Sequence, residues 1–242
     1  MDVSTRLILL DVEGTVSPLT FVQDVLFPYA RQHAADFLAA HIDAPPVEEA
    51  LEQMARDAGK KSFTEWCPLP PESGRAAKWV TEHVYRLMDA DAKQTGLKAL
   101  QGLIWEQGFH SGTLQSTVFP DVPPALAAWV AAGRQVRIYS SGSVQAQKLF
   151  FTHCDAGDLS IYVSGYYDTT TGPKREASSY VAIARNVNLP AGEILFLSDV
   201  PEELDAARGA GMMTGLAMRP GNRPVPHPNH PMVSSFDQIE LR

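Results

Sequence analysis

Acidic side chains follow directly on a short apolar run near the start of the chain. Residues 7–10 read Leu-Ile-Leu-Leu, and Asp11, Glu13 and Thr15 come next, with Gly14 between the last two. Four apolar residues that end in a polar turn are typical of a fully buried strand. At the carboxyl end of such a strand, two carboxylates can hold a cation, and one of them can act as a nucleophile.

Three further polar segments each follow an expected strand. Ser140 and Ser141 precede a helix, where hydroxyls and free N–H groups form an anion site. Lys174 follows a loop, and Asp199 ends another apolar run, with Glu203 four residues later. Taken singly, these are also the marks of an N-cap, a solvated lysine and a capped helix start. Their order, each after a strand of one parallel sheet, predicts that all converge on one edge.

The elements that must position these residues alternate in the second part of the chain. Apolar periodicity predicts strands at 135–140, 161–165, 194–197 and 214–218, and helices at 122–132, 144–153, 176–188 and 201–209. Strands that alternate with helices indicate an α/β fold with a doubly wound parallel sheet and right-handed crossovers. The Pro-rich segment 219–231 is expected to be an ordered surface excursion.

The region between the first and second strands has a helical pattern instead. Helices are predicted at about 21–40, 47–58, 76–92 and 97–109, and no strand is convincing there. Such a block is too long for a loop. We therefore expect an α/β catalytic core of residues 1–18 and 115–242, with an all-helical cap subdomain, residues 19–114, inserted after the first strand as a lid.

Composition narrows the class of protein. The chain has 242 residues and a formal net charge of −8, which argues against a nucleic-acid partner because phosphate backbones are held by surplus Lys and Arg. Cys67 and Cys154 form no CxxC pattern, so we expect free thiols in a reducing compartment and no structural zinc. No signal-peptide layout and no apolar run of ~18 residues is present, which favours a cytoplasmic protein without membrane contact.

The four polar segments together resemble the four motifs of the haloacid dehalogenase superfamily of phosphotransferases. Further segments, residues 20–29, 97–105, 139–148 and 219–222, are similar to the enolase-phosphatase family of methionine salvage, over nearly the whole chain. Most phosphatases of the superfamily carry Asp at the second position of the first motif, where this chain has Glu13, as in the enolase-phosphatase branch. The resemblance implies a Rossmann-like core with an inserted helical cap.

Charge arithmetic gives a separate reason to expect a metal. If Asp11 and Asp199 face a phosphate ester, each like-charge pair at ~4 Å costs about 4 kcal/mol at an effective dielectric of ~20. Lys174 supplies one positive charge, and a divalent ion held by the two aspartates supplies two more. Mg²⁺ suits carboxylates, water and substrate phosphate. The resemblance implies one Mg²⁺ per chain, with the Glu13 backbone carbonyl as a further ligand, and Glu203 is expected to fix a water on the metal.

The expected mechanism starts with attack of Asp11 on phosphorus, which forms an aspartyl-phosphate. Lys174 and the Ser140/Ser141 turn, together with the metal, stabilise the phosphoryl oxygens. Glu13 protonates the leaving oxygen and then activates the water that hydrolyses the intermediate.

The resemblance also implies the substrate and an earlier step. 2,3-Diketo-5-methylthiopentyl-1-phosphate is enolised and then hydrolysed to the acireductone 1,2-dihydroxy-5-(methylthio)pent-1-en-3-one and phosphate. The sequence does not identify the base, for which Glu13 and a metal-bound hydroxide are the candidates. The alternatives are a related phosphatase that acts on another small phosphate ester without enolisation, and a silent module that only binds such a metabolite. A small-molecule partner and a monomer are expected.

Overall fold

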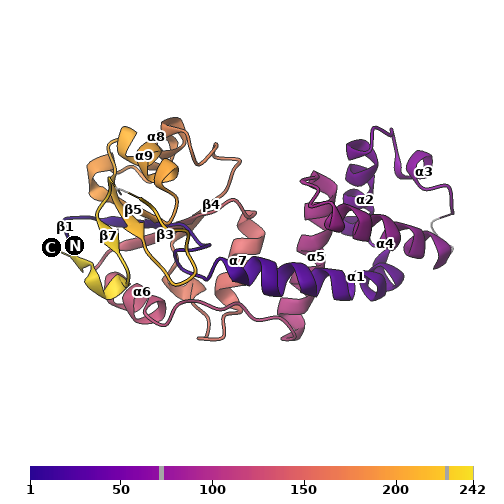
Figure 1. Ribbon diagram of the computed structural model, residues 1–242, viewed down its shortest axis with the longest axis horizontal. Helices are drawn as coiled ribbons and strands as arrows, with labels where there is room; N and C mark the ends of the chain where they lie inside the picture. The colour runs from indigo at the N-terminus through magenta and orange to yellow at the C-terminus, as the bar shows by residue number, and fades with distance from the viewer. Residues whose placement is uncertain (71–73, 227–228, 242) are drawn as a thin grey trace. The chain divides into compact units, whose positions relative to one another are not determined.

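The computed structural model describes residues 1–70, 74–226 and 229–241 of the chain. It contains two compact units (Figure 1), one formed by Met1–Val22 with Gln115–Arg242 and the other by Gln23–Leu114. The division into a catalytic core of residues 1–18 and 115–242 and a cap of residues 19–114 stays a prediction.

A parallel sheet forms the centre of the first unit. Its strands are β2 (Leu7–Leu10), β3 (Gln135–Tyr139), β4 (Gly165–Tyr167), β5 (Ile194–Ser198), β6 (Met213–Ala217) and β7 (Met232–Val233), in the order β4-β3-β2-β5-β6-β7. Leu7 of β2 pairs with Gln135 on one side and Ile194 on the other, so β2 is central. Because helices cover both faces of such a sheet, all four residues of β2 are fully buried.

Helices on both faces of this sheet confirm the expected α/β fold. Their bounds are α6 (Val122–Ala131), α7 (Val144–Thr152), α8 (Ala177–Asn186) and α9 (Pro201–Gly209). In Figure 1, α8 and α9 lie on one face and α6 on the opposite face. Leu7 and Leu9 pack with Tyr180 of α8 and Leu204 of α9 in one buried cluster. Each such side chain contributes roughly 1.5–3 kcal/mol on burial, which makes the central strand a rigid support.

The predicted strand at 161–165 is wrong. A 3₁₀ turn, Ser160–Tyr162, occupies its first part, and β4 begins only at Gly165. Ile161 leaves 70% of its surface exposed, so its apolar side chain marked no buried position. Pairing with β3 starts where Gly165 lies opposite Arg137, and a Cβ at Gly165 would lie 2.7 Å from the Arg137 guanidinium.

Two short pairings near the chain ends were not predicted. β7 adds an edge strand to the sheet, and β1 (Asp2–Val3) pairs with β8 (Glu240–Leu241), which brings the two termini side by side (Figure 1). Strands of two residues are too short to show a period. The surface excursion expected at 219–231 is also wrong for Arg219, which is buried; residues 227–228 of that segment lie outside the described residues.

In the described ranges of the second unit, 23–70 and 74–114, the regular elements are all helices. A π-helix, Val22–Leu26, leads into α1 (Phe27–His41), and α2 (Pro45–Asp57), α3 (Phe63–Trp66), α4 (Gly74–Asp89) and α5 (Thr95–Ser111) follow. Pro28 lies in the first turn of α1, directly after the π-helix, so the chain is already helical where it reaches the proline. Gly96 lets α5 approach α2 closely, because a Cβ there would collide with the backbone of Met54.

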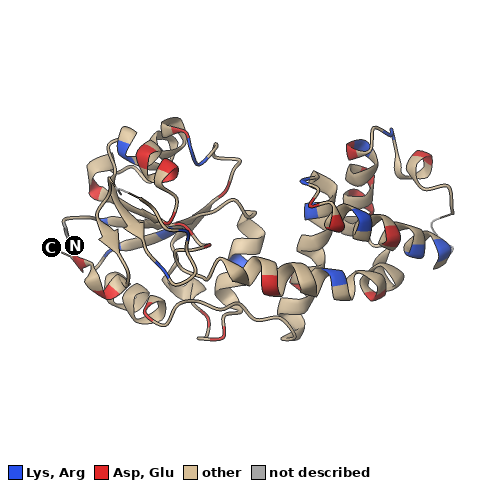
Figure 2. Ribbon diagram, in the orientation of Figure 1, with Lys and Arg blue, Asp and Glu red and all other residues tan. Residues whose placement is uncertain are grey.

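Surface charge in the helical unit is mixed. Figure 2 shows basic and acidic positions interspersed along α1, α2 and α4, a pattern typical of solvated helix faces. Of the helices that the structure describes, none is both long and apolar enough to cross a membrane.

Candidate active site

The turn after β2 places two acidic residues in different environments. The backbone N–H of Asp11 donates to the Leu197 carbonyl at 2.9 Å, which continues the pairing of β2 with β5 one residue further. The chain then turns through Gly14, whose φ of +73° lies in the left-handed region that favours glycine. In this turn Asp11 is buried, while Glu13 is exposed by its surface area.

A steric constraint also requires glycine at position 14. A Cβ at this position would lie 2.5 Å from Oδ2 of Asp199, a contact that real structures do not tolerate. We expect Gly14→Ala to displace Asp199 and to lower kcat/KM by about 10²-fold, since misplacements near 1 Å have effects of that size. Steady-state kinetics on the purified variant measure this.

Gly59→Ala is the matched control for that experiment. Gly59 has φ of +75°, and nothing lies within 4 Å of a Cβ built there. The control therefore introduces the same backbone strain, about 1–2 kcal/mol, without the collision. It should lose stability but keep its kcat/KM. Equal kinetics for the two variants would contradict the steric role of Gly14.

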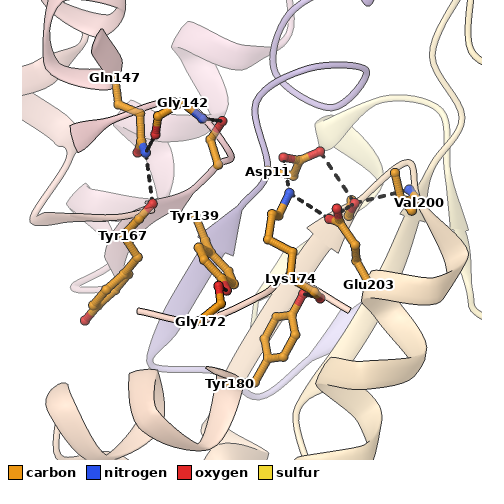
Figure 3. Close-up of polar contacts among 12 residues, drawn as sticks. Asp11, Tyr139, Gly142, Gln147, Tyr167, Gly172, Lys174, Tyr180, Val200 and Glu203 are labelled. Atoms are coloured by element: carbon orange, nitrogen blue, oxygen red, sulfur yellow. Dashed lines mark hydrogen bonds and ion pairs between the residues drawn. The ribbon is translucent and has the colours of Figure 1, made fainter. Parts of the chain in front are cut away.

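Lys174 lies between two carboxylates, as Figure 3 shows. Its Nζ is 2.6 Å from Oδ1 of Asp11 and 2.7 Å from Oε2 of Glu203, and its side chain is only 7% exposed. Burial alone would lower the pKa of Lys174, but the charges and hydrogen bonds of Asp11 and Glu203 raise it above its usual range. The lysine is therefore a fixed cation beside Asp11.

A set of hydrogen bonds to main-chain carbonyls holds the loop that carries Lys174. The Tyr180 hydroxyl donates to the carbonyl of Lys174 itself at 2.7 Å, and the Tyr139 hydroxyl donates to that of Gly172 at 2.8 Å (Figure 3). Ser179 donates to the next carbonyl of the same loop, that of Pro173, at 2.7 Å. The buried tyrosines come from the sheet and from α8, so the rigid core determines the position of the ammonium.

The end of β5 supplies a third carboxylate, that of Asp199. Burial, together with the charges of Asp11 and Glu203, raises the pKa of Asp199 to about 7. Its Oδ1 is buried and has no hydrogen-bond partner among the described residues. Ser198, next to it, lies 3.0 Å from Oε2 of Glu203 and accepts from the N–H of Val200 at 3.1 Å. Asp199 is therefore the carboxylate that lacks a counter-charge.

The donor set fits a small divalent cation. Asp11, Asp199 and Glu203 face one ammonium, so full ionisation leaves two negative charges in excess. No cluster of three or more His, Cys, Asp or Glu side chains suited to a metal occurs in the described ranges. Mg²⁺ does not need one, because it takes one or two carboxylates and completes its shell with water and phosphate. The unpartnered Oδ1 of Asp199 is the atom that such an ion would satisfy.

Glu13 completes the acidic group. Desolvation and the charge of Asp11 raise the pKa of Glu13, although Lys174 lowers it in part. Although Glu13 is exposed by its surface area, enough protein surrounds its carboxyl to desolvate it in part. A carboxyl whose pKa is raised in this way is suited to proton transfer.

The turn between β3 and α7 contains the two predicted hydroxyls. Ser140 is buried, and its Oγ accepts from the N–H of Gly142 at 3.3 Å, while Ser141 is exposed. Ser143 caps α7 instead, because its Oγ accepts from the N–H of Ala146 at 3.2 Å. The N-cap alternative therefore applies to Ser143, and Ser140 and Ser141 stay in front of the helix N-terminus, where its dipole attracts anions.

Gln147 supports this turn and was not predicted. Its Nε2 donates to the carbonyls of Gly142 at 2.7 Å and Tyr167 at 2.9 Å (Figure 3), which joins the turn to the end of β4. The segment 139–148 contains Gln147 and carried the resemblance, but nothing in the sequence distinguished this glutamine from an ordinary helix residue.

Arg219 supports the turn after β2 in a similar way. Its Nε donates to the Thr15 carbonyl at 3.0 Å, and its Nη1 lies 2.8 Å from Oδ2 of Asp121. The guanidinium carbon lies 4.8 Å from the ring centroid of Phe119 and 4.3 Å from that of Phe236. Stacking between two rings explains how a charged side chain is accommodated in the interior.

A family model described as a haloacid dehalogenase-like hydrolase matches residues 5–211. The chain belongs to the haloacid dehalogenase-like hydrolases. Hydrolases of this family generally use Mg²⁺, in keeping with the excess of negative charge described above.

Curated relatives match almost the entire length. The chain is 47% identical to "Enolase-phosphatase E1" of Synechococcus elongatus over 239 residues, 99% of both chains, and 46% identical to the protein of the same name from Pseudomonas aeruginosa over 235 residues, 97% of both. The UTR4 protein of Saccharomyces cerevisiae has a similar structure, with a TM-score of 0.77 and 36% identity over 97% of this chain and all of that one. CbbY of Rhodobacter sphaeroides, at 15% identity and a TM-score of 0.57, shares the fold.

Proposed function

We propose that this hydrolase is the bifunctional enolase-phosphatase of methionine salvage. Its substrate would be 2,3-diketo-5-methylthiopentyl-1-phosphate, and its products the acireductone and phosphate. The observation that carries the phosphatase chemistry is the 2.6 Å contact between Lys174 and Asp11, residues 163 positions apart in the chain. Full-length similarity to proteins named enolase-phosphatase supports the choice of substrate.

Enolisation comes first in this proposal. A proton leaves C1, which carries the phosphate, and the C2 carbonyl oxygen gains one, so that a C1=C2 double bond and an enol hydroxyl form. Glu13 is the candidate on this chain for moving that proton, because its raised pKa brings the carboxyl closer to neutral pH.

Phosphate transfer follows. Asp11 attacks phosphorus as the bond to the ester oxygen on C1 breaks, and Glu13, which has taken up a proton from solvent after the first step, donates it to that leaving oxygen. Lys174 neutralises charge on the phosphoryl group, and the Ser140/Ser141 turn donates hydrogen bonds to it. Glu13, now ionised, takes a proton from the water that attacks the aspartyl-phosphate and restores Asp11.

Asp11 and Asp199 would hold the Mg²⁺, one per chain, with the backbone carbonyl of Glu13. When bound, the ion neutralises phosphoryl charge and polarises the carbonyl beside the reacting carbon. Residues 1–22 and 115–242 are proposed to form the catalytic core, with the helical unit as an insertion into it.

Turnover of the diketo phosphate tests the proposal. The purified protein with Mg²⁺ should release phosphate, and an ultraviolet-absorbing enol product should accumulate; excess EDTA should abolish both signals, and Mg²⁺ should restore them. Simple sugar phosphates are the comparison substrates. Faster release from those esters than from the diketo phosphate would favour a phosphatase without enolisation, and chelator-insensitive release would contradict the metal site.

A further inference from the structure

Asn222, from a distant part of the chain, makes close polar contacts with the turn after β2. Its Nδ2 donates to the Gly14 carbonyl at 2.8 Å and to the Ala217 carbonyl, at the end of β6, at 3.0 Å. The Asn222 backbone N–H donates to the Arg219 carbonyl at 3.1 Å, which closes a tight turn. Because Arg219 is itself buried between aromatic rings, this turn is anchored to the core.

These contacts determine which way the Asn222 amide faces. Two carbonyl oxygens lie beside one of its terminal atoms, and only the NH₂ group can donate to both of them. The Oδ1 atom must therefore face away from the Gly14 and Ala217 carbonyls. It is buried and has no hydrogen-bond partner within the described part of the chain.

The free oxygen of Asn222 lies on the same side of Gly14 as the Asp199 carboxylate. A Cβ on Gly14 would be 3.1 Å from Oδ1 of Asn222 and 2.5 Å from Oδ2 of Asp199, so both oxygens approach one point. Oδ1 of Asp199 is likewise buried without a partner among the residues described. Two unpartnered acceptors beside one glycine need a shared source of positive charge or of donors.

We propose that Asn222 is a positioning residue of the cation site. Its Nδ2 holds the Gly14 peptide next to Asp199, and its Oδ1 accepts a hydrogen bond from the hydration shell of the cation. Mg²⁺ keeps several of its waters in protein sites, and acceptors that orient them affect affinity. A residue that only tied two loops together would not need a buried acceptor directed toward a carboxylate. The inference rests on the Mg²⁺ site of the proposed function.

Direct metal binding tests this role without relying on turnover. Isothermal titration calorimetry with MgCl₂ on the substrate-free protein should give a Kd that rises about tenfold or more in Asn222→Ala, the usual effect of removing a group that orients ligands. Asn186→Ala is the matched control. Asn186, the last residue of α8, also accepts a side-chain hydrogen bond, from the Tyr167 hydroxyl at 2.7 Å. Its Kd should equal that of the wild type.

A kinetic readout separates positioning from loss of the fold. In Asn222→Ala the Mg²⁺ concentration for half-maximal phosphate release should rise with the Kd, and saturating Mg²⁺ should restore most of kcat. If Asn222→Ala does not fold, the same measurements are made on Asn222→Ser, which retains a small polar side chain. They are judged by the same criteria.

The outcomes distinguish two failures. Wild-type protein that binds no Mg²⁺ would overturn the metal site of the proposed function. Wild-type protein that binds Mg²⁺, with a folded Asn222→Ala of unchanged Kd, would overturn the role of Asn222 alone. A kcat that stays low at saturating Mg²⁺ while the Kd is unchanged would assign Asn222 a purely structural role and so reject the inference.

Discussion

Asp11→Asn should abolish phosphate release while enolisation survives. An amide is a poor nucleophile, so kcat for phosphate release should fall on the order of 10⁴-fold or more, as for loss of other essential nucleophiles. Proton transfer between carbon and oxygen needs no covalent bond to Asp11. Ultraviolet absorbance of the enol should therefore rise when the variant is mixed with the diketo phosphate and Mg²⁺, without release of phosphate.

The fold should tolerate this substitution. Asparagine has nearly the same shape as aspartate, and Lys174 keeps its second carboxylate, that of Glu203, at 2.7 Å. The lysine is therefore not left as an isolated buried charge, which would be costly. Circular dichroism and the thermal midpoint of the variant check that the protein remains folded.

Asp205→Asn is the matched control. Asp205 also pairs with a cation, the Arg208 guanidinium at 2.5 Å, but its side chain is 54% exposed on α9. Surface pairs of this kind contribute little, so phosphate release should change by less than about twofold. Normal release by Asp11→Asn would remove Asp11 as the nucleophile. Loss of both the enol and phosphate signals, with Mg²⁺ binding intact, would contradict separate roles for the two steps.

The central part of the fold was predictable because burial there depends on local pattern. Residues 7–10 are apolar without interruption, as a strand covered on both faces must be, and all four are fully buried. The edges were less predictable. β4 and β7 exist because a neighbouring strand offers unpaired groups, and their two or three residues are too few to show a period.

The convergence of the strand ends followed from topology. Carboxyl ends of parallel strands meet at one edge, so Asp11, Asp199 and the segment that carries Lys174 come together. Topology did not predict which other side chain each of these residues contacts. The role of Glu203 in fixing a water on the metal stays a prediction. The contact of its Oε2 with Lys174 at 2.7 Å depends on the packing of α9 against the sheet, which the sequence pattern did not show.

The residues that hold the turn after β2 in place were the hardest to identify from the sequence. Arg219 and Asn222 belong to a segment rich in Pro and Gly, a composition typical of surface loops. Arg219 is buried only because Phe119 and Phe236, from distant parts of the chain, supply the rings on both sides of it. No local pattern contains that information, although the resemblance included residues 219–222.

Lys174→Met should lower both activity and stability. The methionine has a similar length but no charge, so Asp11 and Glu203 remain buried side by side without a counter-ion. Leaving a buried charge unpaired costs about 3–5 kcal/mol, and loss of a group that stabilises transition-state charge lowers kcat about 10²–10³-fold. Urea unfolding in EDTA and steady-state phosphate release measure the two effects.

The stability loss should depend on pH in a defined direction. Burial and the charge of Asp11 already raise the pKa of Glu203 in the wild type, and Lys174 opposes that rise. Without the lysine, the pKa of Glu203 in the folded variant rises further above its unfolded value. The folded variant then binds more protons than the unfolded chain as pH falls through this raised pKa, so its free energy of unfolding approaches that of the wild type toward lower pH.

Two further variants separate charge balance from simple loss of a side chain. Lys174→Met with Glu203→Gln removes one carboxylate as well, so it should regain part of the stability but none of the activity, because the cation beside Asp11 is still missing. Lys93→Met removes a lysine that is 66% exposed and pairs with Asp91, and it should change stability by less than about 0.5 kcal/mol. A pH-independent stability loss in Lys174→Met would show that lost packing, not charge, is responsible, and normal activity would exclude Lys174 from phosphate transfer.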